Sequence, residues 1–445
     1  MTITNYYLNY YNLLKVFIFF LIVGNLARSI AKTPSAAIEL ILLGSLLFFA
    51  IIYAAQNYKI KKGSTLVFLL FLLYLLLHTI SASIIRPFSI GTSFFLTLQF
   101  NLLEFRISTI SYFLPLIFLP LSKINIEKFE NYFYILLKFT IIYTIFEQIF
   151  SLIGFRSFFE SFYMSSGVVT DNQIGIKSIG MYRIWGLVGS PQLLGVFHIL
   201  TLFFMLYKKD NFWALLSIIG IIVSTSKTAY LLLLLIGLLY LLYKKEYVLL
   251  ILITFLLTLG IFLAFEYYFY LEEQAKFAKG IDDQNRGFRK FMGSIIGFFY
   301  LMTNTHVPGA PAGGFISGGP VMLFFDYYAE NPLEIFLGKG ITYAFMQDNI
   351  ITDSPFLNYL YLTSDFYIVS YFDQYGIIGL LLLVFVFFLY PFIRLFIDRN
   401  LLNFIPIIIF IAMFHYPPQI AKLMMIISSY AMWKIYLYND EQKET

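Results

Sequence analysis

The chain has no cysteine and only four histidines in 445 residues. Without cysteine, disulfide bonds, thiol nucleophiles and cysteine-ligated metal sites are excluded. The histidines His78, His198, His306 and His415 are scattered, and no two of them have the spacing of a paired metal site. We therefore expect no metal and no cofactor held by these side chains.

Charged side chains are also scarce. They make up 12% of the residues, against 60% hydrophobic ones. A soluble chain of this length could not bury so much apolar surface, so the composition predicts an all-α polytopic membrane protein, with residues 1–445 as a single integral membrane domain. No basic stripe lies on a soluble domain, so nucleic acid is not expected as a partner.

Short loops rich in lysine and arginine fix the predicted topology, because such loops normally stay cytoplasmic. Five such loops all agree with cytoplasmic termini: KIKK at 59–62, SKINIEK at 122–128, YKKDN at 207–211, YKKE at 243–246 and the segment with Arg394 and Arg399. About twelve spans satisfy them: 13–30, 36–55, 64–85, 104–121, 132–154, 190–207, 212–225, 228–243, 247–267, 374–393, 401–415 and 419–436.

The stretch 212–243 is apolar except for STSKT at 224–228. A single helix of that length would measure about 48 Å, against a hydrocarbon core of roughly 30 Å. Basic loops flank both ends, so the chain must cross an even number of times between them. We expect two short crossings joined at STSKT, with Lys227 at the outer surface.

Three segments are predicted to face outward: 86–103, 155–189 and 268–373. The last is a large periplasmic loop between the ninth and tenth spans, with 11 acidic residues against 6 basic ones. Charges inside the predicted spans are few. Glu39, Lys138 and Glu147 stand out, and we expect each to be structural.

Two outward segments contain candidate chemistry. In SIGMYRIWGLVGSPQLLGVF at 178–197, Arg183 precedes a GSPQ turn in which Ser190 and Pro191 suit a helix start, and an arginine near a helix N-terminus suits a phosphate. At the other end of the large loop, Asp365 and Asp373 lie above the membrane surface, where apolar surroundings favour a general base.

Four motifs occur in a fixed order: RIWGLVGSPQLLG before a span, STSKT between two short spans, NPLEIFLGKG in the large loop, and SDFYIVSYFDQYGIIGLL leading into the next span. This arrangement resembles the O-antigen polymerase and O-antigen ligase superfamily, and the polymerase branch most closely. The family usually has Ser-Arg where this chain has Ser226-Lys227, and its ligases carry histidine where this chain has Asp365.

The resemblance implies polymerisation of undecaprenyl-pyrophosphate-linked oligosaccharide repeat units into O-antigen or capsule at the periplasmic face of the bacterial inner membrane. The resemblance thus implies a multi-pass glycosyltransferase in the bilayer, which acts with a chain-length regulator and a flippase. Such an enzyme needs no nucleotide cofactor, because its lipid-pyrophosphate donor is already activated. The implied catalytic residues are Asp365 as base and Arg183 on the pyrophosphate.

The implied substrate-binding residues lie in both outer loops and at STSKT. Arg156 with Gly167 and Arg286 with Gly297 fit an Arg-x10-Gly pattern described for polymerases. The full set is Lys227, Arg286, Arg156, Asp353 and His306.

Two other functions remain open at this point. An O-antigen ligase would need the same cations and is favoured if His306 rather than Asp365 is essential. A lipid-linked oligosaccharide flippase or other transporter would line a cavity across the bilayer with charge, whereas charge here gathers at the outer surface.

Overall fold

The structure is a computed structural model. It describes residues 3–31, 35–58, 63–90, 93–107, 109–124, 126–165, 177–178, 181–277, 332–338, 340, 367–414 and 422–438. Within these ranges, five helical segments are long and apolar enough to cross a membrane: Ile38–Asn57, Gly63–Ile84, Ile126–Tyr163, Tyr247–Tyr270 and Tyr371–Asp398. The protein is therefore an all-α membrane protein, as predicted, whereas the count of twelve spans stays a prediction.

The chain divides into two compact units. Unit 1 comprises Met1–Ile80, Leu98–Ile236 and Ile378–Thr445. Its elements are α1 (Ile3–Ala31), α2 (Ser35–Asn57), η1 (Thr109–Lys123), α5 (Ile126–Phe150), η2 (Ser151–Phe155), α6 (Arg156–Ser165), β1 (Lys177–Ser178), β2 (Met181–Tyr182), α7 (Pro191–Tyr207), α8 (Asn211–Val223), η5 (Phe385–Leu389), α17 (Tyr390–Asp398), η6 (Leu401–Asn403), α18 (Phe404–Ala412), α19 (Lys422–Met432) and η8 (Trp433–Leu437).

Unit 2 comprises Ser81–Thr97 and Gly237–Ile377. It contains all of α10 (Tyr247–Phe277) and all of α13 (Pro332–Leu337). Four helices have residues in both units: α3 (Gly63–Ile90), α4 (Phe94–Ile107), α9 (Lys227–Lys244) and α16 (Tyr367–Val384).

Where they are described, the predicted spans fall largely on helix, with one correction. The segment 104–121 is not one helix: α4 ends at Ile107 and η1 begins at Thr109. Pro115 and Pro120 lie inside η1, where each lacks the N–H that an α-helix needs, and the segment runs as a 3-10 helix. Helices extend into the segment 86–103, since α3 continues to Ile90 and α4 begins at Phe94, and its outward orientation stays a prediction.

The predicted break at STSKT is confirmed. α8 ends at Val223 and α9 begins at Lys227, so the long apolar stretch forms two helices joined by Ser224–Ser226. Thr225 has a left-handed backbone (φ 53°), and the Ser226 hydroxyl accepts a hydrogen bond from the Ala229 amide at 3.2 Å. This hydroxyl satisfies one of the free amides at the start of α9.

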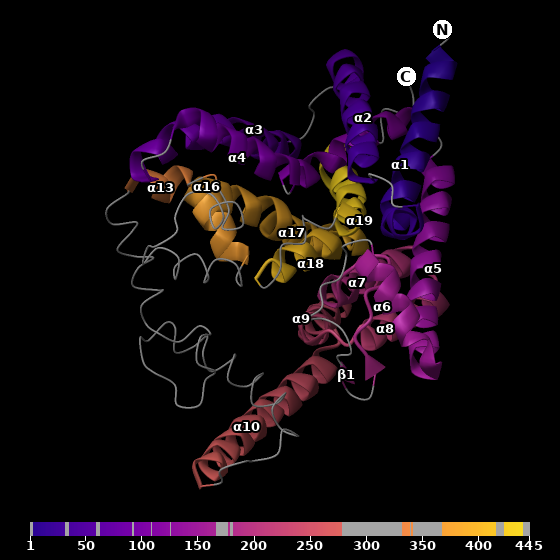
Figure 1. Ribbon diagram of the computed structural model, residues 1–445, viewed down its shortest axis with the longest axis vertical. Coiled ribbons are helices and arrows are strands. Elements are labelled where there is room, and N and C mark those ends of the chain that lie inside the picture. The colour runs from indigo at the N-terminus through magenta and orange to yellow at the C-terminus, as the bar shows by residue number, and fades with distance from the viewer. Residues whose placement is uncertain are drawn as a thin grey trace. The chain divides into compact units, whose positions relative to one another are not determined.

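Helices α7 and α8 pack against each other in unit 1, and α5 contacts α8 (Figure 1). Gly195 in the first turns of α7 lets the STSKT turn approach closely. A Cβ atom at Gly195 would clash with the Ala229 side chain and lie 2.8 Å from Ser224 Oγ. The start of α7 and the STSKT turn therefore lie at the same end of this bundle.

A charged cluster marks the opposite end of α7. Glu130 of α5 forms ion pairs with Lys208 at 2.9 Å and Lys434 at 3.7 Å, and it accepts a hydrogen bond from Tyr430. Lys208 immediately follows α7 and belongs to the YKKDN loop. Burial of Glu130 is thus compensated by two cations and a hydroxyl.

The intramembrane charges predicted to be structural all have partners in unit 1. Glu39 pairs with Lys422 at 2.5 Å. Lys138 lies 3.6 Å from Asp210, and a hydrogen bond from Tyr134 holds the pKa of Asp210 below its usual value. Glu147 is considered with the candidate site.

In unit 2, the NPLEIFLGKG motif docks onto a break in α16. Gly376 interrupts α16 with φ 65°, and Gly338 has φ 74°. Gly340 N donates to Gln374 O at 2.9 Å, and Gln374 Nε2 donates back to Gly340 O at 3.3 Å. Neither Gly338 nor Gly376 leaves room for a Cβ atom, so the two backbones meet directly.

The close approach at Gly195 generates a test. We expect Gly195→Ala to lower the free energy of unfolding by about 1–3 kcal/mol, because overpacking at this contact outweighs the higher helix propensity of alanine. Thermal unfolding of the purified protein in detergent measures the change. Gly44→Ala in α2 is the matched control, since nothing lies within 4 Å of its new Cβ. Equal melting temperatures for the two variants would contradict the contact.

Candidate functional site

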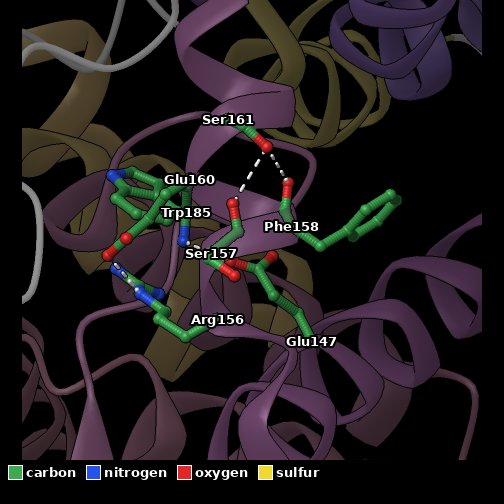
Figure 2. A network of polar contacts seen from close by, with 7 residues as sticks. All are labelled: Glu147, Arg156, Ser157, Phe158, Glu160, Ser161 and Trp185. Atoms are coloured by element: carbon green, nitrogen blue, oxygen red, sulfur yellow. Dashed lines mark hydrogen bonds and ion pairs between the residues drawn. The ribbon is translucent and has the colours of Figure 1, made fainter.

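The candidate site gathers the side chains of Glu147, Arg156 and Trp185 (Figure 2). Helix α5 ends at Phe150, and η2 carries the chain through Gly154, whose φ of 108° breaks the helix axis. Helix α6 then begins with Arg156. This break places the last turn of α5 and the first turn of α6 around the loop 183–190.

Glu147 is the centre of the site. It is fully buried, and its carboxylate accepts hydrogen bonds from the backbone amides of Trp185 at 3.0 Å and Gly186 at 2.9 Å. The Tyr163 hydroxyl lies 3.2 Å from the same carboxylate and 3.0 Å from the Gly186 carbonyl. A buried carboxylate needs such donors, and amide dipoles supply them without a counter-ion.

Tyrosines extend this network. Tyr143 and Tyr163 hydroxyls are 2.7 Å apart. Either hydroxyl can donate in this pair, which links Tyr143 to Glu147 through Tyr163.

Glu147 and its neighbour Gln148 together hold the segment that precedes α7. In the orientation that satisfies both of its atoms, the Gln148 amide pairs with the N–H and the carbonyl of Tyr182, each at 3.2 Å. Tyr182 belongs to β2, which pairs antiparallel with β1. The resulting short hairpin is the one departure from the predicted all-α fold in the described part of the chain.

Arg156 is the second buried charge of the site. Its side chain is 7% exposed, and its Nε donates to Glu160 Oε1 at 2.8 Å. The guanidinium carbon lies 4.0 Å from the centre of the Trp185 ring and 5.1 Å from that of Tyr182. Stacking on these two rings fixes the plane of the guanidinium.

Several donors around Arg156 remain unpaired. Within the described residues, Arg156 Nη1 and Nη2 are buried without a hydrogen-bond partner, and so is Trp185 Nε1. Buried donors are almost always paired in native proteins, and an arginine with Nε engaged still presents a forked pair of N–H groups. The arrangement is suited to an anion with two or more oxygens. Because Glu160 occupies the Nε side of the guanidinium, an anion could bind only at the edge formed by Nη1 and Nη2.

The structure brings only part of the predicted site together. Arg156 is central to it. Arg183 lies two residues before Trp185, is partly exposed, and makes no ion pair or hydrogen bond within the described part of the chain. The backbone of Lys227 begins α9 beside the STSKT turn, at the same end of α7 as Arg183.

The other predicted residues lie outside the described ranges: Asp365, Asp353, Arg286 and His306. Asp373 is described and is buried in α16. Sequence reasoning missed Trp185 and Tyr163 as parts of the site, and it took Glu147 only as structural. One signal in the sequence could have indicated these contacts. Glu147 and Gln148 are two adjacent polar residues near the end of an apolar predicted span.

Comparison with known families, with characterised proteins and with solved structures gives no match for this chain.

The Glu147 network predicts a ranked loss of stability. Glu147→Ala leaves two buried amides unpaired, at about 1–3 kcal/mol each. Glu147→Gln keeps one carbonyl oxygen as an acceptor, so its loss should be smaller. Thermal unfolding in detergent measures both.

Glu127→Ala is the control for these variants, because Glu127 is an exposed glutamate in the first turn of the same helix. We expect the melting temperature to fall in the order Glu127→Ala, Glu147→Gln, Glu147→Ala. A Glu147→Ala protein as stable as the control would show that the carboxylate does not hold the loop.

Proposed function

We propose that this protein polymerises oligosaccharide repeat units carried on a lipid pyrophosphate, at the periplasmic face of the bacterial inner membrane. The observation that carries the proposal is the buried guanidinium of Arg156, whose two NH2 groups have no hydrogen-bond partner among the described residues. The order of motifs along the sequence supports the same function.

The chemistry of glycan transfer needs such a group. The bond between the sugar and the pyrophosphate breaks, and negative charge develops on the leaving pyrophosphate. A cation whose orientation is fixed before the reaction stabilises that charge most effectively in a site that excludes water. Arg156 meets these requirements, because two aromatic rings and Glu160 fix its plane.

Two further cations are proposed to contact the pyrophosphate. Arg183 and Lys227 flank the first turns of α7: Leu194 lies against Gly186 in the Arg183 loop, and Gly195 lies against the STSKT turn. Their positions at one end of α7 support a shared ligand. Arg183 has no competing ion pair in the described residues.

The remaining roles are proposed from the sequence. Asp365 takes the proton of the acceptor hydroxyl, and that hydroxyl oxygen forms the new bond to the donor sugar. Arg286, Asp353 and His306 are proposed to bind the glycan or its pyrophosphate. Two lipid-linked substrates held side by side at the membrane supply proximity. A flippase and a chain-length regulator are the proposed partner proteins.

A strain that lacks the protein and is complemented with variants tests the proposal. The deletion strain should carry single repeat units and no ladder of longer glycans on a gel. Wild type should restore the ladder, and Arg156→Ala should reduce chain growth by 100-fold or more, a loss of about 2.7 kcal/mol in transition-state stabilisation. Arg156→Lys keeps the charge without the fork and should restore growth only partly.

Arg394→Ala is the matched control, because Arg394 is also a span-end arginine with a carboxylate partner, Asp398, at 2.6 Å. It should support a normal ladder, and immunoblots should show equal amounts of all variants. A full ladder with Arg156→Ala would overturn the role of Arg156. Complete loss of surface glycan in the deletion strain would overturn polymerisation itself.

A further inference from the structure

The apolar helix that contains α5 is too long to cross a membrane once. It runs from Ile126 to Tyr163, or 38 residues. At 1.5 Å per residue this is about 57 Å, whereas the hydrocarbon core is roughly 30 Å thick. The axis breaks at Gly154, whose backbone is not helical. Therefore α6, which follows the break, need not continue the direction of α5.

A stripe of exposed apolar side chains runs along α5. Its members recur every three or four residues, and each is 41–62% exposed: Ile135, Phe139, Ile142, Phe146 and Ile149. In a membrane helix such a face lies against lipid, because no element in the described part of the chain covers it and exposure to water would be unfavourable.

The exposed apolar stripe continues past the break. Leu152, Ile153, Phe155 and Phe158 are 52–63% exposed, and the Phe158 ring stacks on that of Phe162. The same environment that covers the stripe on α5 therefore extends to the first turn of α6.

The other sides of α6 differ in character. Phe159 and Tyr163 are buried against Trp185, together with the Arg156 side chain. Ser157 and Ser161 are exposed and polar. A short helix with one face on protein, one apolar face exposed and one polar edge is typical of a segment that lies in a membrane–water interface.

We infer that α6 is a membrane-surface helix: Phe155 and Phe158 insert into the lipid at this end of α5, while Ser161 faces water. Its partner is the bilayer itself. This inference rests on the helix break and the pattern of exposure, and it holds whether or not the protein polymerises glycans.

The position of α6 in the membrane surface also sets the depth of the Arg156 site. Arg156 lies between Phe155 and Phe158 in sequence, but its side chain is on the buried side of the helix. Insertion of these two rings sets the unpaired guanidinium N–H groups at the depth of the lipid phosphates. An anion attached to a lipid would then reach Arg156 from the bilayer and not through the aqueous phase.

The lack of native cysteine makes a direct test possible, because a single introduced thiol is the only labelling position. Phe158→Cys, Phe155→Cys, Ser161→Cys and Ile142→Cys would each be labelled with bimane and reconstituted into liposomes. Ile142 is the control for the lipid-facing stripe near the middle of α5. All four side chains are exposed, so labelling should not disturb the packed interior.

Quenching by nitroxide lipids and by aqueous iodide then reports depth. We expect labels at 155 and 158 to be quenched at least twofold more by a shallow nitroxide lipid than the label at 161, which should respond to iodide. The label at 142 should respond best to a deep nitroxide.

Two results would overturn the inference. Labels at 155 and 158 that respond to iodide as strongly as the label at 161 would place α6 in water. Labels at 155 and 158 shielded from both quenchers would mean that protein, such as a second copy of this chain, covers the face. Having two labelled positions on the apolar face keeps the test decisive if one variant does not fold.

Discussion

The hydrogen bonds from the Trp185 and Gly186 amides to the buried Glu147 carboxylate are the interaction on which the candidate site depends. A charge in an apolar bundle is strongly destabilising unless donors surround it. By using backbone amides as those donors, Glu147 fixes the path of the loop before α7, and Gln148 fixes the strand before that loop. The Trp185 ring is thereby held against Arg156, and the guanidinium is oriented before any ligand binds.

Helix α5 thus supports α7 at both ends. Glu147 binds the backbone just before α7, and Glu130, about 25 Å away along α5 at 1.5 Å per residue, binds Lys208 just after it. The two buried carboxylates use different partners: backbone amides at one end, lysines and Tyr430 at the other. Both pairings resist sliding of α7 relative to α5. The loops at the two ends of α7 are therefore fixed relative to each other.

Hydrophobic runs and turn residues predicted most of the helices, including the break at STSKT and the start of α7 at Pro191, because these depend on local chemistry. The Ser190 hydroxyl, expected to cap α7, instead bonds to the Gln192 side chain. The Arg-x10-Gly spacing of Arg156 and Gly167 predicted Arg156 as a substrate-binding residue. The partners of Glu147 could not be predicted, since Trp185 and Gly186 are close to it only after three segments pack together.

Binding of a lipid pyrophosphate at Arg156 is the most direct test of this account. The chain has three tryptophans, so Trp213→Phe with Trp433→Phe leaves Trp185, which stacks on Arg156, as the reporter. In detergent, farnesyl pyrophosphate should change the Trp185 fluorescence in a saturable way, and farnesol should not. We expect that adding Arg156→Ala abolishes the change. An equal response with and without Arg156, or no response to farnesyl pyrophosphate at all, would contradict it.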